Sequence, residues 1–310
     1  SSLKSRLEPS LDLMADVAMQ PSFPQEDWEL MRGKRMQDLE AARMDPGQMS
    51  WRGWARTIYG ESYLGHLASE EAYESMGREH MQAWYSAHVS AENATILVGG
   101  DTTLAEIQPL LEARFGDWTT PSTEESSEVE LDFQALPSAD DLPTHDGSTI
   151  YLLDSPGAAQ SVIRGGTVVT SRTDDDYAAF TLANHVIGGQ FSARINLNLR
   201  EDKGWTYGAR SGLRSDYTKA LWSASTSVKT DTTADSISEI LREVSEASDE
   251  RKFTVEELEN ARGYLLGSRP VRYENAGALL GELQSNWLYG LPDNWITAYA
   301  DNIRAVSIDS

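Results

Sequence analysis

An arginine and a tyrosine stand seven positions apart in a segment whose pattern places both beside one turn. Residues 188–211 read GGQFSARINLNLREDKGWTYGARS. A Gly-Gly break is followed by apolar residues at helical spacing, which predicts a helix that ends at Arg200 and a strand that begins near Tyr207. A guanidinium and a phenol both donate hydrogen bonds, so this pair could bind a carbonyl oxygen or an oxyanion. A surface arginine and a core tyrosine are the alternative.

This segment closely resembles the C-terminal half of the insulinase/pitrilysin family, the inverted zinc metallopeptidases. There a G-G-x-x-S-x-R-L-x-x-x-L-R stretch runs through a short charged turn into a G-x-x-Y strand start. Arg200 and Tyr207 match its arginine and tyrosine at the same separation, whereas Ile195 and Trp205-Thr206 depart from the pattern conservatively. The resemblance covers about residues 10–305. It implies that Arg200 and Tyr207 contact the substrate from the domain opposite the zinc.

The zinc motif of that family is absent from this sequence. The motif is H-x-x-E-H, in which two histidines bind the metal and the glutamate polarises a water molecule. The five histidines do not form it: His66, His80, His88, His145 and His185. The family's third ligand, a glutamate, aligns with Asp38, which is one methylene shorter, and a helix-surface carboxylate is the default interpretation there. We expect no metal ligands and no cofactor in this chain, with zinc supplied in the complete enzyme from upstream residues or a partner subunit.

Composition excludes several other classes of function. The chain has 49 acidic and 26 basic residues, a net charge of -23, which argues against nucleic-acid binding. It has no cysteine, so disulfides and thiolate metal sites are excluded. No apolar run approaches the ~18–20 residues that cross a membrane, and no signal segment opens the chain. A periplasmic or otherwise exported location is expected, with the cytoplasm as the alternative. The G-x-S-x-G and GK[ST] motifs of acyl and phosphoryl chemistry are also missing.

An internal repeat is visible without any reference to a family. Residues 23–33, FPQEDWELMRG, match residues 253–263, FTVEELENARG, at an offset of 230. The register continues without a gap to Tyr-Gly pairs at 59–60 and 289–290. Chance similarity between acidic helices is the alternative. The repeat predicts two copies of one structural unit, and the resemblance implies the same, as two similar domains facing each other across a cleft.

The order of patterns along the chain predicts an α+β fold, with an antiparallel-rich sheet backed by helices in each domain. The C-terminal part of the first domain is expected over residues 1–118, an acidic Ser/Pro-rich linker over 119–148, and the second domain over 149–310. In the first domain we predict helices at 25–42, around 51–58, 70–88 and 104–115, and a strand at 94–98. In the second we predict strands at 151–153, 161–170, 207–213 and 220–228, and helices at 174–187, 232–248, 254–268, 273–289 and 293–304. Truncation at both ends is expected from the comparison of the two copies.

The resemblance implies the substrate-binding part of a zinc-dependent peptidase, which holds the scissile peptide carbonyl and is inactive by itself. Its expected partners are a peptide or protein substrate and either a zinc-bearing partner subunit or a second copy of the chain. A non-catalytic structural or assembly protein on the same fold is the alternative, and a peptide-binding module without turnover is a third possibility. An H-x-x-E-H motif upstream of Ser1 would distinguish an enzyme from a partner subunit.

Overall fold

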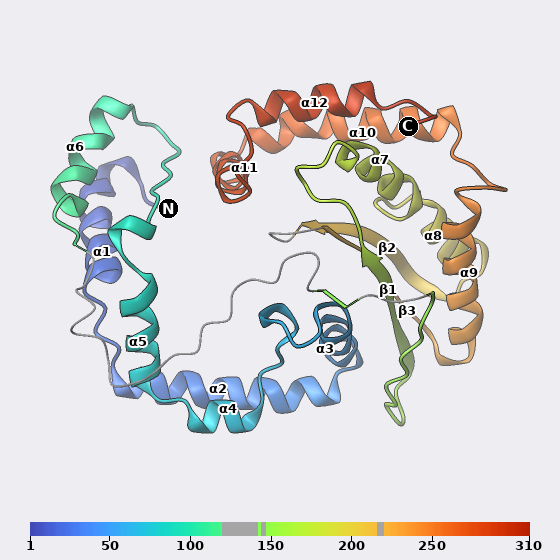
Figure 1. Ribbon diagram of the computed structural model, residues 1–310, viewed down its shortest axis with the longest axis horizontal. Helices are drawn as coiled ribbons and strands as arrows, with labels where there is room; N and C mark the ends of the chain where they lie inside the picture. The colour runs from blue at the N-terminus through green and yellow to red at the C-terminus, as the bar shows by residue number, and fades with distance from the viewer. Residues whose placement is uncertain (120–141, 144–146, 216–219) are drawn as a thin grey trace. The chain divides into compact units, whose positions relative to one another are not determined.

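The computed structural model describes residues 1–119, 142–143, 147–215 and 220–310 (Figure 1). Its residues cluster into two compact units. Unit 1 comprises Ser1–Glu40, Ala68–Gln134 and Leu279–Gly281, and unit 2 comprises Ala41–Leu67, Ala135–Ala278 and Glu282–Ser310. The predicted linker over 119–148 lies mostly outside the described residues, so the domain boundaries at 118 and 149 stay predictions. None of the helices in the described ranges is long and apolar enough to cross a membrane.

Unit 1 is helical in its described part. Its elements are α1 (Leu7–Met19), most of α2 (Gln25–Met44), α4 (Glu70–Ser75), α5 (Arg78–His88) and α6 (Leu104–Phe115). Arg114 of α6 joins α1 through ion pairs with Asp12, at 2.6 Å, and Glu8, at 3.3 Å. The Tyr85 hydroxyl of α5 donates a hydrogen bond to the Ala18 carbonyl at 2.6 Å.

Two predictions for this region are wrong. The single helix over 70–88 is two helices, because Met76 and Gly77 have extended backbone between α4 and α5. The strand over 94–98 is not formed. A strand requires a neighbour that accepts and donates its backbone hydrogen bonds, and the described part of unit 1 contains no strand that could pair with it.

Unit 2 contains a three-stranded antiparallel sheet. Its strands are β1 (Gln160–Val168), β2 (Thr206–Ser215) and β3 (Ala220–Lys229), in the order β1-β3-β2. Helix α3 (Pro46–Tyr59) covers one face, where Leu221 packs with Ala55 and Ile58. The chain is therefore a helix-rich α+β protein with a small antiparallel sheet. The strand predicted at 151–153 is wrong, since these residues are exposed and pair with none of the three strands.

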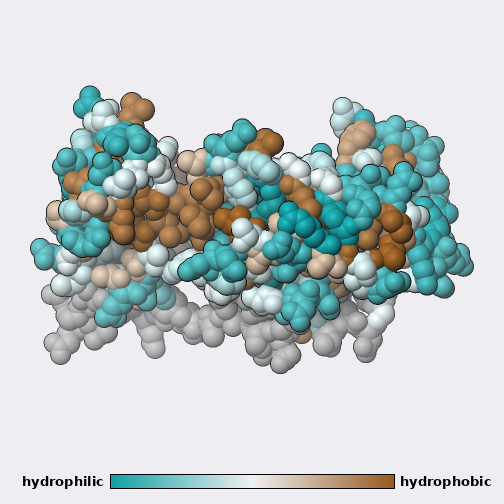
Figure 2. All heavy atoms as spheres, turned by 90° about the horizontal axis from the view of Figure 1, so that it is seen from above, coloured by the Kyte–Doolittle hydropathy of each residue, from teal (hydrophilic) through white to brown (hydrophobic). Residues whose placement is uncertain are grey.

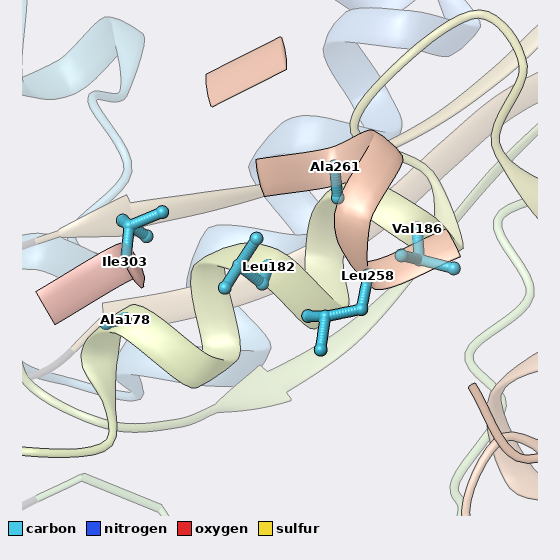
Figure 3. Close-up of a cluster of buried hydrophobic side chains, with 6 residues drawn as sticks. All are labelled: Ala178, Leu182, Val186, Leu258, Ala261 and Ile303. Carbon is cyan, nitrogen blue, oxygen red and sulfur yellow. The ribbon is translucent and has the colours of Figure 1, made fainter. Parts of the chain in front are cut away.

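Unit 2 also contains α7 (Tyr177–Ile187), α9 (Thr233–Glu246), α10 (Val255–Tyr273), most of α11 (Ala276–Leu288) and α12 (Trp295–Ala305). Two apolar clusters hold α7, α9, α10 and α12. In the first, α7 packs against α10 and α12 through six buried residues: Ala178, Leu182, Val186, Leu258, Ala261 and Ile303 (Figure 3). In the second, Ile195 and Leu199, both almost fully buried, pack between the sheet and Ile240 of α9. Burying each leucine or isoleucine contributes about 1.5–3 kcal/mol.

The helices at the two repeated segments have matching bounds. At an offset of 230 residues, α2 corresponds to α10 and α3 to α11. The residue before the second helix of each copy caps that helix. The Asp45 carboxylate accepts a hydrogen bond from the Gln48 N–H of α3, and the Asn275 side chain accepts one from the Gly277 N–H of α11. Both segments end in a left-handed residue, Gly60 with φ 58° and Gly290 with φ 61°, a conformation that favours glycine.

Candidate functional site

A short irregular helix carries Arg200. It consists of α8 (Arg194–Asn196) and the π-helical segment η6 (Leu197–Asp202), so the predicted helix end at Arg200 lies two residues too early. The Lys203 N–H donates to the Asn198 carbonyl five residues earlier, at 3.2 Å. Gly204, with φ 64°, then reverses the chain toward β2. Single π-helical turns are rare and occur frequently at functional sites.

A β-bulge directs Tyr207 outward. Thr206 pairs with Val228 and Ala209 with Thr226, so Tyr207 and Gly208 lie opposite the single residue Ser227 of β3. The Thr206 hydroxyl accepts hydrogen bonds from the Gly208 N–H, at 3.0 Å, and from the Thr226 hydroxyl, at 2.8 Å. Bulges of this kind re-aim a side chain. The phenol of Tyr207 is 89% exposed, so the alternative of a core tyrosine does not apply.

The structure brings Arg200 and Tyr207 together. The Arg200 guanidinium carbon lies 5.3 Å from the centre of the Tyr207 ring and 4.4 Å from that of Phe191. Its Nε also lies 3.4 Å from a carboxylate oxygen of Glu201. Each cation–π contact at an exposed site contributes about 0.5–1 kcal/mol, so the guanidinium is held between two rings. Phe191 has the helical spacing of Ile195 and Leu199 in the sequence, but it precedes the helix and is 63% exposed.

One buried amide ties the two halves of this site together. The Asn196 side chain, 3% exposed, donates to the Phe191 carbonyl at 2.6 Å and accepts from the Ala209 N–H at 3.0 Å. It therefore joins the loop before the helix to the strand after the turn. Sequence analysis missed this residue. The available signal was an asparagine between Ile195 and Leu197 in the predicted helix.

A second buried polar group anchors η6 on α9. The Asn198 amide donates to carboxylates of Glu239, at 2.8 Å, and Glu243, at 2.7 Å. Lys203 lies 3.5 Å from Glu239. Burial raises the pKa of the Glu239 carboxyl, but the Asn198 hydrogen bond and the charges of Arg242 and Lys203 outweigh burial and lower it. These contacts hold the helix that carries Arg200 against α9.

The Gly-Gly pair before this helix is required by packing. A Cβ atom at Gly188 would lie 2.5 Å from the Ile195 side chain and 2.6 Å from the Ser211 nitrogen, and the Ser211 N–H donates to the Gly188 carbonyl at 2.9 Å. Only a glycine permits this close approach of the chain to β2.

The described histidines and acidic residues do not fit a zinc site. Zinc in proteins takes at least three protein ligands, and no group of three or more His, Cys, Asp or Glu side chains in the described residues could hold a metal ion. Asp38 is exposed on α2 and forms an ion pair with Arg35 at 3.8 Å. His185 is buried against the ring of Tyr264, and burial lowers the pKa of its imidazole. His145 lies outside the described residues.

Residues 75–265 match the family described as the peptidase M16 inactive domain. The chain therefore belongs to the peptidase M16 family, a family of zinc proteases, and is of its inactive-domain type. The resemblance to the insulinase/pitrilysin metallopeptidases is thereby confirmed.

Two relatives in sequence carry different descriptions. An uncharacterized zinc protease of Streptomyces coelicolor is 22% identical over 320 residues, which cover 99% of this chain and 67% of the relative. YmxG of Helicobacter pylori, a non-peptidase homolog, is 27% identical over 134 residues, which cover 43% of this chain and 31% of the relative. The chain thus spans at most about two thirds of the length of these proteins.

Solved structures share the fold. A peptidase M16 inactive domain from Pseudomonas fluorescens superposes with a TM-score of 0.85 at 20% identity, covering 99% of this chain and 71% of the other. The periplasmic protease PqqL from Escherichia coli superposes with a TM-score of 0.72 at 13% identity, covering 98% of this chain and 32% of PqqL. At these identities the likeness is one of fold.

Proposed function

We propose that this chain is the substrate-binding part of a zinc-dependent M16-type peptidase, in which Arg200 and Tyr207 hold the scissile carbonyl. Hydrolysis of a peptide bond places negative charge on the carbonyl oxygen. Hydrogen-bond donors preset around that oxygen contribute more in the transition state than in the bound substrate. A guanidinium and a phenol side by side provide such donors.

The observation that carries this proposal is the availability of both donor groups. Within the described residues, neither the Tyr207 hydroxyl nor the terminal nitrogens of Arg200 take part in a hydrogen bond, although Phe191, the bulge and Asn196 hold both side chains in place. Preorganised donors without an internal partner are what binding of an oxyanion requires. A purely structural arginine would be expected to form hydrogen bonds within the protein.

Zinc belongs to the complete enzyme in this proposal. The residues described here do not form its site, so the metal comes from another segment of the polypeptide or from a zinc-bearing partner subunit. Association with a second copy of the chain is the alternative to such a subunit. The zinc protease relative supports this assignment. The fold shared with a periplasmic protease supports a periplasmic or exported location, with the cytoplasm as the alternative.

The proposed enzyme also has two similar domains that face each other across a cleft. The matching bounds of α2 with α10 and of α3 with α11 support the duplication, as do the two left-handed glycines. The cleft follows from the family resemblance and remains a proposal.

A non-catalytic role in structure or assembly is the second candidate. It is favoured by the missing metal ligands among the described side chains and by the relative YmxG, which is a non-peptidase homolog. It offers no reason why the Tyr207 hydroxyl and the terminal nitrogens of Arg200 form no hydrogen bond with the described part of the chain. A peptide-binding module without turnover would keep the pair but lose the catalytic step.

The test is the Tyr207→Phe variant in the zinc-loaded assembly. The substitution removes one donor and keeps the ring beside Arg200. We expect kcat to fall by on the order of 10²–10³, with KM much less affected. Tyr151→Phe is the matched control, since Tyr151 is also exposed, at 63%, and lies outside the site.

Two results would decide against the catalytic proposal. An unchanged kcat in Tyr207→Phe would make the pair structural. An assembly that binds peptide but never cleaves it, with binding weakened by Arg200→Ala, would instead favour the binding module.

A further inference from the structure

A cluster of charged and polar side chains in unit 2 plays no part in the proposed activity. It lies where α10, α11 and α12 meet the loop between β1 and α7. Arg172 of this loop and Arg269 of α10 lie 3.5 Å and 3.7 Å from the same carboxylate oxygen of Glu282, in α11. The two guanidinium groups are therefore close together, and the Glu282 carboxylate, 7% exposed, is shared between them.

Aromatic rings hold both guanidinium groups in place. The guanidinium carbon of Arg269 lies 4.2 Å from the centre of the Tyr299 ring, and that of Arg172 lies 5.5 Å from the centre of the Tyr289 ring. A terminal nitrogen of Arg172 also donates a hydrogen bond to the Ser285 hydroxyl at 2.8 Å. Groups that are fixed before a ligand arrives lose little conformational entropy when they bind it.

Some buried hydrogen-bonding atoms of this cluster have no partner within the described residues. Asn286 follows Ser285 and lies one helical turn after Glu282. It is 5% exposed, yet neither its amide nitrogen nor its amide oxygen forms a hydrogen bond. The Nε of Arg172 is also buried without a partner. Buried polar atoms are almost always paired with protein, water or a bound group, so the cluster has donors for a further acceptor.

The internal repeat indicates that the helix pair forms without these residues. At the offset of 230, Arg269 corresponds to Leu39 and Asn286 to Arg56, although α2 and α3 match α10 and α11 in their bounds. The polar cluster is thus a feature of the second copy alone. This difference favours a role in binding over a role in holding the two helices together.

The cluster is partly accessible from solvent. The side chains of Arg172 and Arg269 are 19% and 17% exposed. Figure 2 looks down on α10, α11 and α12, which lie at the top of Figure 1, and shows hydrophilic residues (teal) interspersed with apolar ones (brown) over them. The guanidinium groups are thus accessible to a small charged solute.

We propose that this cluster binds a carboxylate group, either of a small organic acid or of a peptide C-terminus. Two arginines against one glutamate leave an excess of one positive charge, which the single negative charge of a carboxylate balances. Its two oxygens accept hydrogen bonds from guanidinium groups in the favoured fork geometry, and the Asn286 amide supplies a further donor. The proposal does not depend on the proposed activity.

Titration of the ¹⁵N-labelled full chain with sodium acetate, at an ionic strength kept constant with sodium chloride, tests the proposal. We expect a saturable shift of the Arg172 Nε–H signal in NMR spectra. Asn286→Leu and Arg269→Gln should each raise the Kd of acetate by about tenfold or more, since each removes a donor to a charged group. Arg304→Gln is the matched control and should leave the Kd unchanged, because Arg304 is 59% exposed on α12 and pairs with Asp301.

Trialanine with a free or an amidated C-terminus distinguishes the two sources of the carboxylate. Tighter binding of the free tripeptide than of acetate assigns the site to a peptide C-terminus, and equal binding assigns it to small acids. Four outcomes overturn the proposal: no saturation by acetate, an equally large response to chloride alone, equal binding of the amidated tripeptide, or an equal loss in Arg304→Gln. Unchanged affinity in Asn286→Leu also overturns it, even where Arg269→Gln lowers the melting temperature.

Discussion

Replacing Glu257 by glutamine tests the contact that holds the site helix to α10. Arg194, in the α8 turn that leads to Arg200, donates from Nε and Nη2 to the two carboxylate oxygens of Glu257, both at 2.7 Å. Bidentate arginine–carboxylate pairs are among the strongest hydrogen-bonded pairs in proteins. The Glu257 carboxylate also accepts from the Thr254 N–H at the start of α10, at 2.9 Å. Glutamine keeps this cap but removes the charge.

The size of the effect follows from the pKa of Glu257. The Arg194 hydrogen bond lowers this pKa from 4.5 to about 2, against the opposing effect of burial. A lowering of the pKa from 4.5 to about 2 corresponds to at most about 3.4 kcal/mol of stability, at 1.36 kcal/mol per pKa unit. Because the side chain is 30% exposed, water screens part of this, and we expect about 1–3 kcal/mol.

The sign of the pH dependence is determined by the lowered pKa. A carboxyl group whose pKa is depressed in the folded state stabilises the protein above its unfolded pKa, about 4.5, and the contribution is lost as the pH falls toward 2. Glu257→Gln should therefore lower the melting temperature at pH 7 by several degrees. The difference between wild type and variant should shrink between pH 4.5 and 2.

The assay is thermal unfolding of both proteins, followed by circular dichroism from pH 7 to 2.5. Glu256→Gln is the control, since Glu256 is an exposed neighbour in the first turn of α10. A difference that is as large at pH 2.5 as at pH 7 would refute the assignment of the effect to the charge. An equal loss in Glu256→Gln would assign it to the helix terminus in general.

Three further predictions concern the scaffold of the site. Asn196→Ala leaves the buried Ala209 N–H without its acceptor and should lower the free energy of unfolding by about 1–3 kcal/mol, measured by urea unfolding. An unchanged urea midpoint would mean that water replaces the amide. Gly188→Ala places a methyl group against Ile195 and β2 and should lower the free energy of unfolding by about 1–3 kcal/mol. Gly33→Ala, in open space on α2, should instead raise it by up to about 1 kcal/mol. Equal effects at the two glycines would contradict the explanation from packing. Phe191→Ala removes one ring from Arg200 and should lower kcat/KM of the zinc-loaded assembly by about two- to fivefold, and no change would show that Tyr207 alone orients the guanidinium.

The candidate pair was predictable because it depends on local structure. A helix, a glycine turn and a strand start within eight residues put Arg200 and Tyr207 on the same side of one turn, whatever surrounds them. The exposure of Tyr207 was not predictable, because it depends on the register between β2 and β3, which is set by residues 20 positions away. Phe191 and Asn196 were missed for the same reason, since their roles arise from contacts across the turn.

The sequence by itself determined most helices, the repeat at 230 residues and the proximity of Arg200 and Tyr207, because periodicity, caps and left-handed glycines act over a few neighbouring residues. Only the tertiary structure decided which apolar runs became strands. Residues 161–168 pair with β3 and belong to β1, whereas residues 94–98 and 151–153 have equally suitable sequences and form no strand. A strand is stabilised by hydrogen bonds to another segment, so its formation depends on that segment as well as on its own residues.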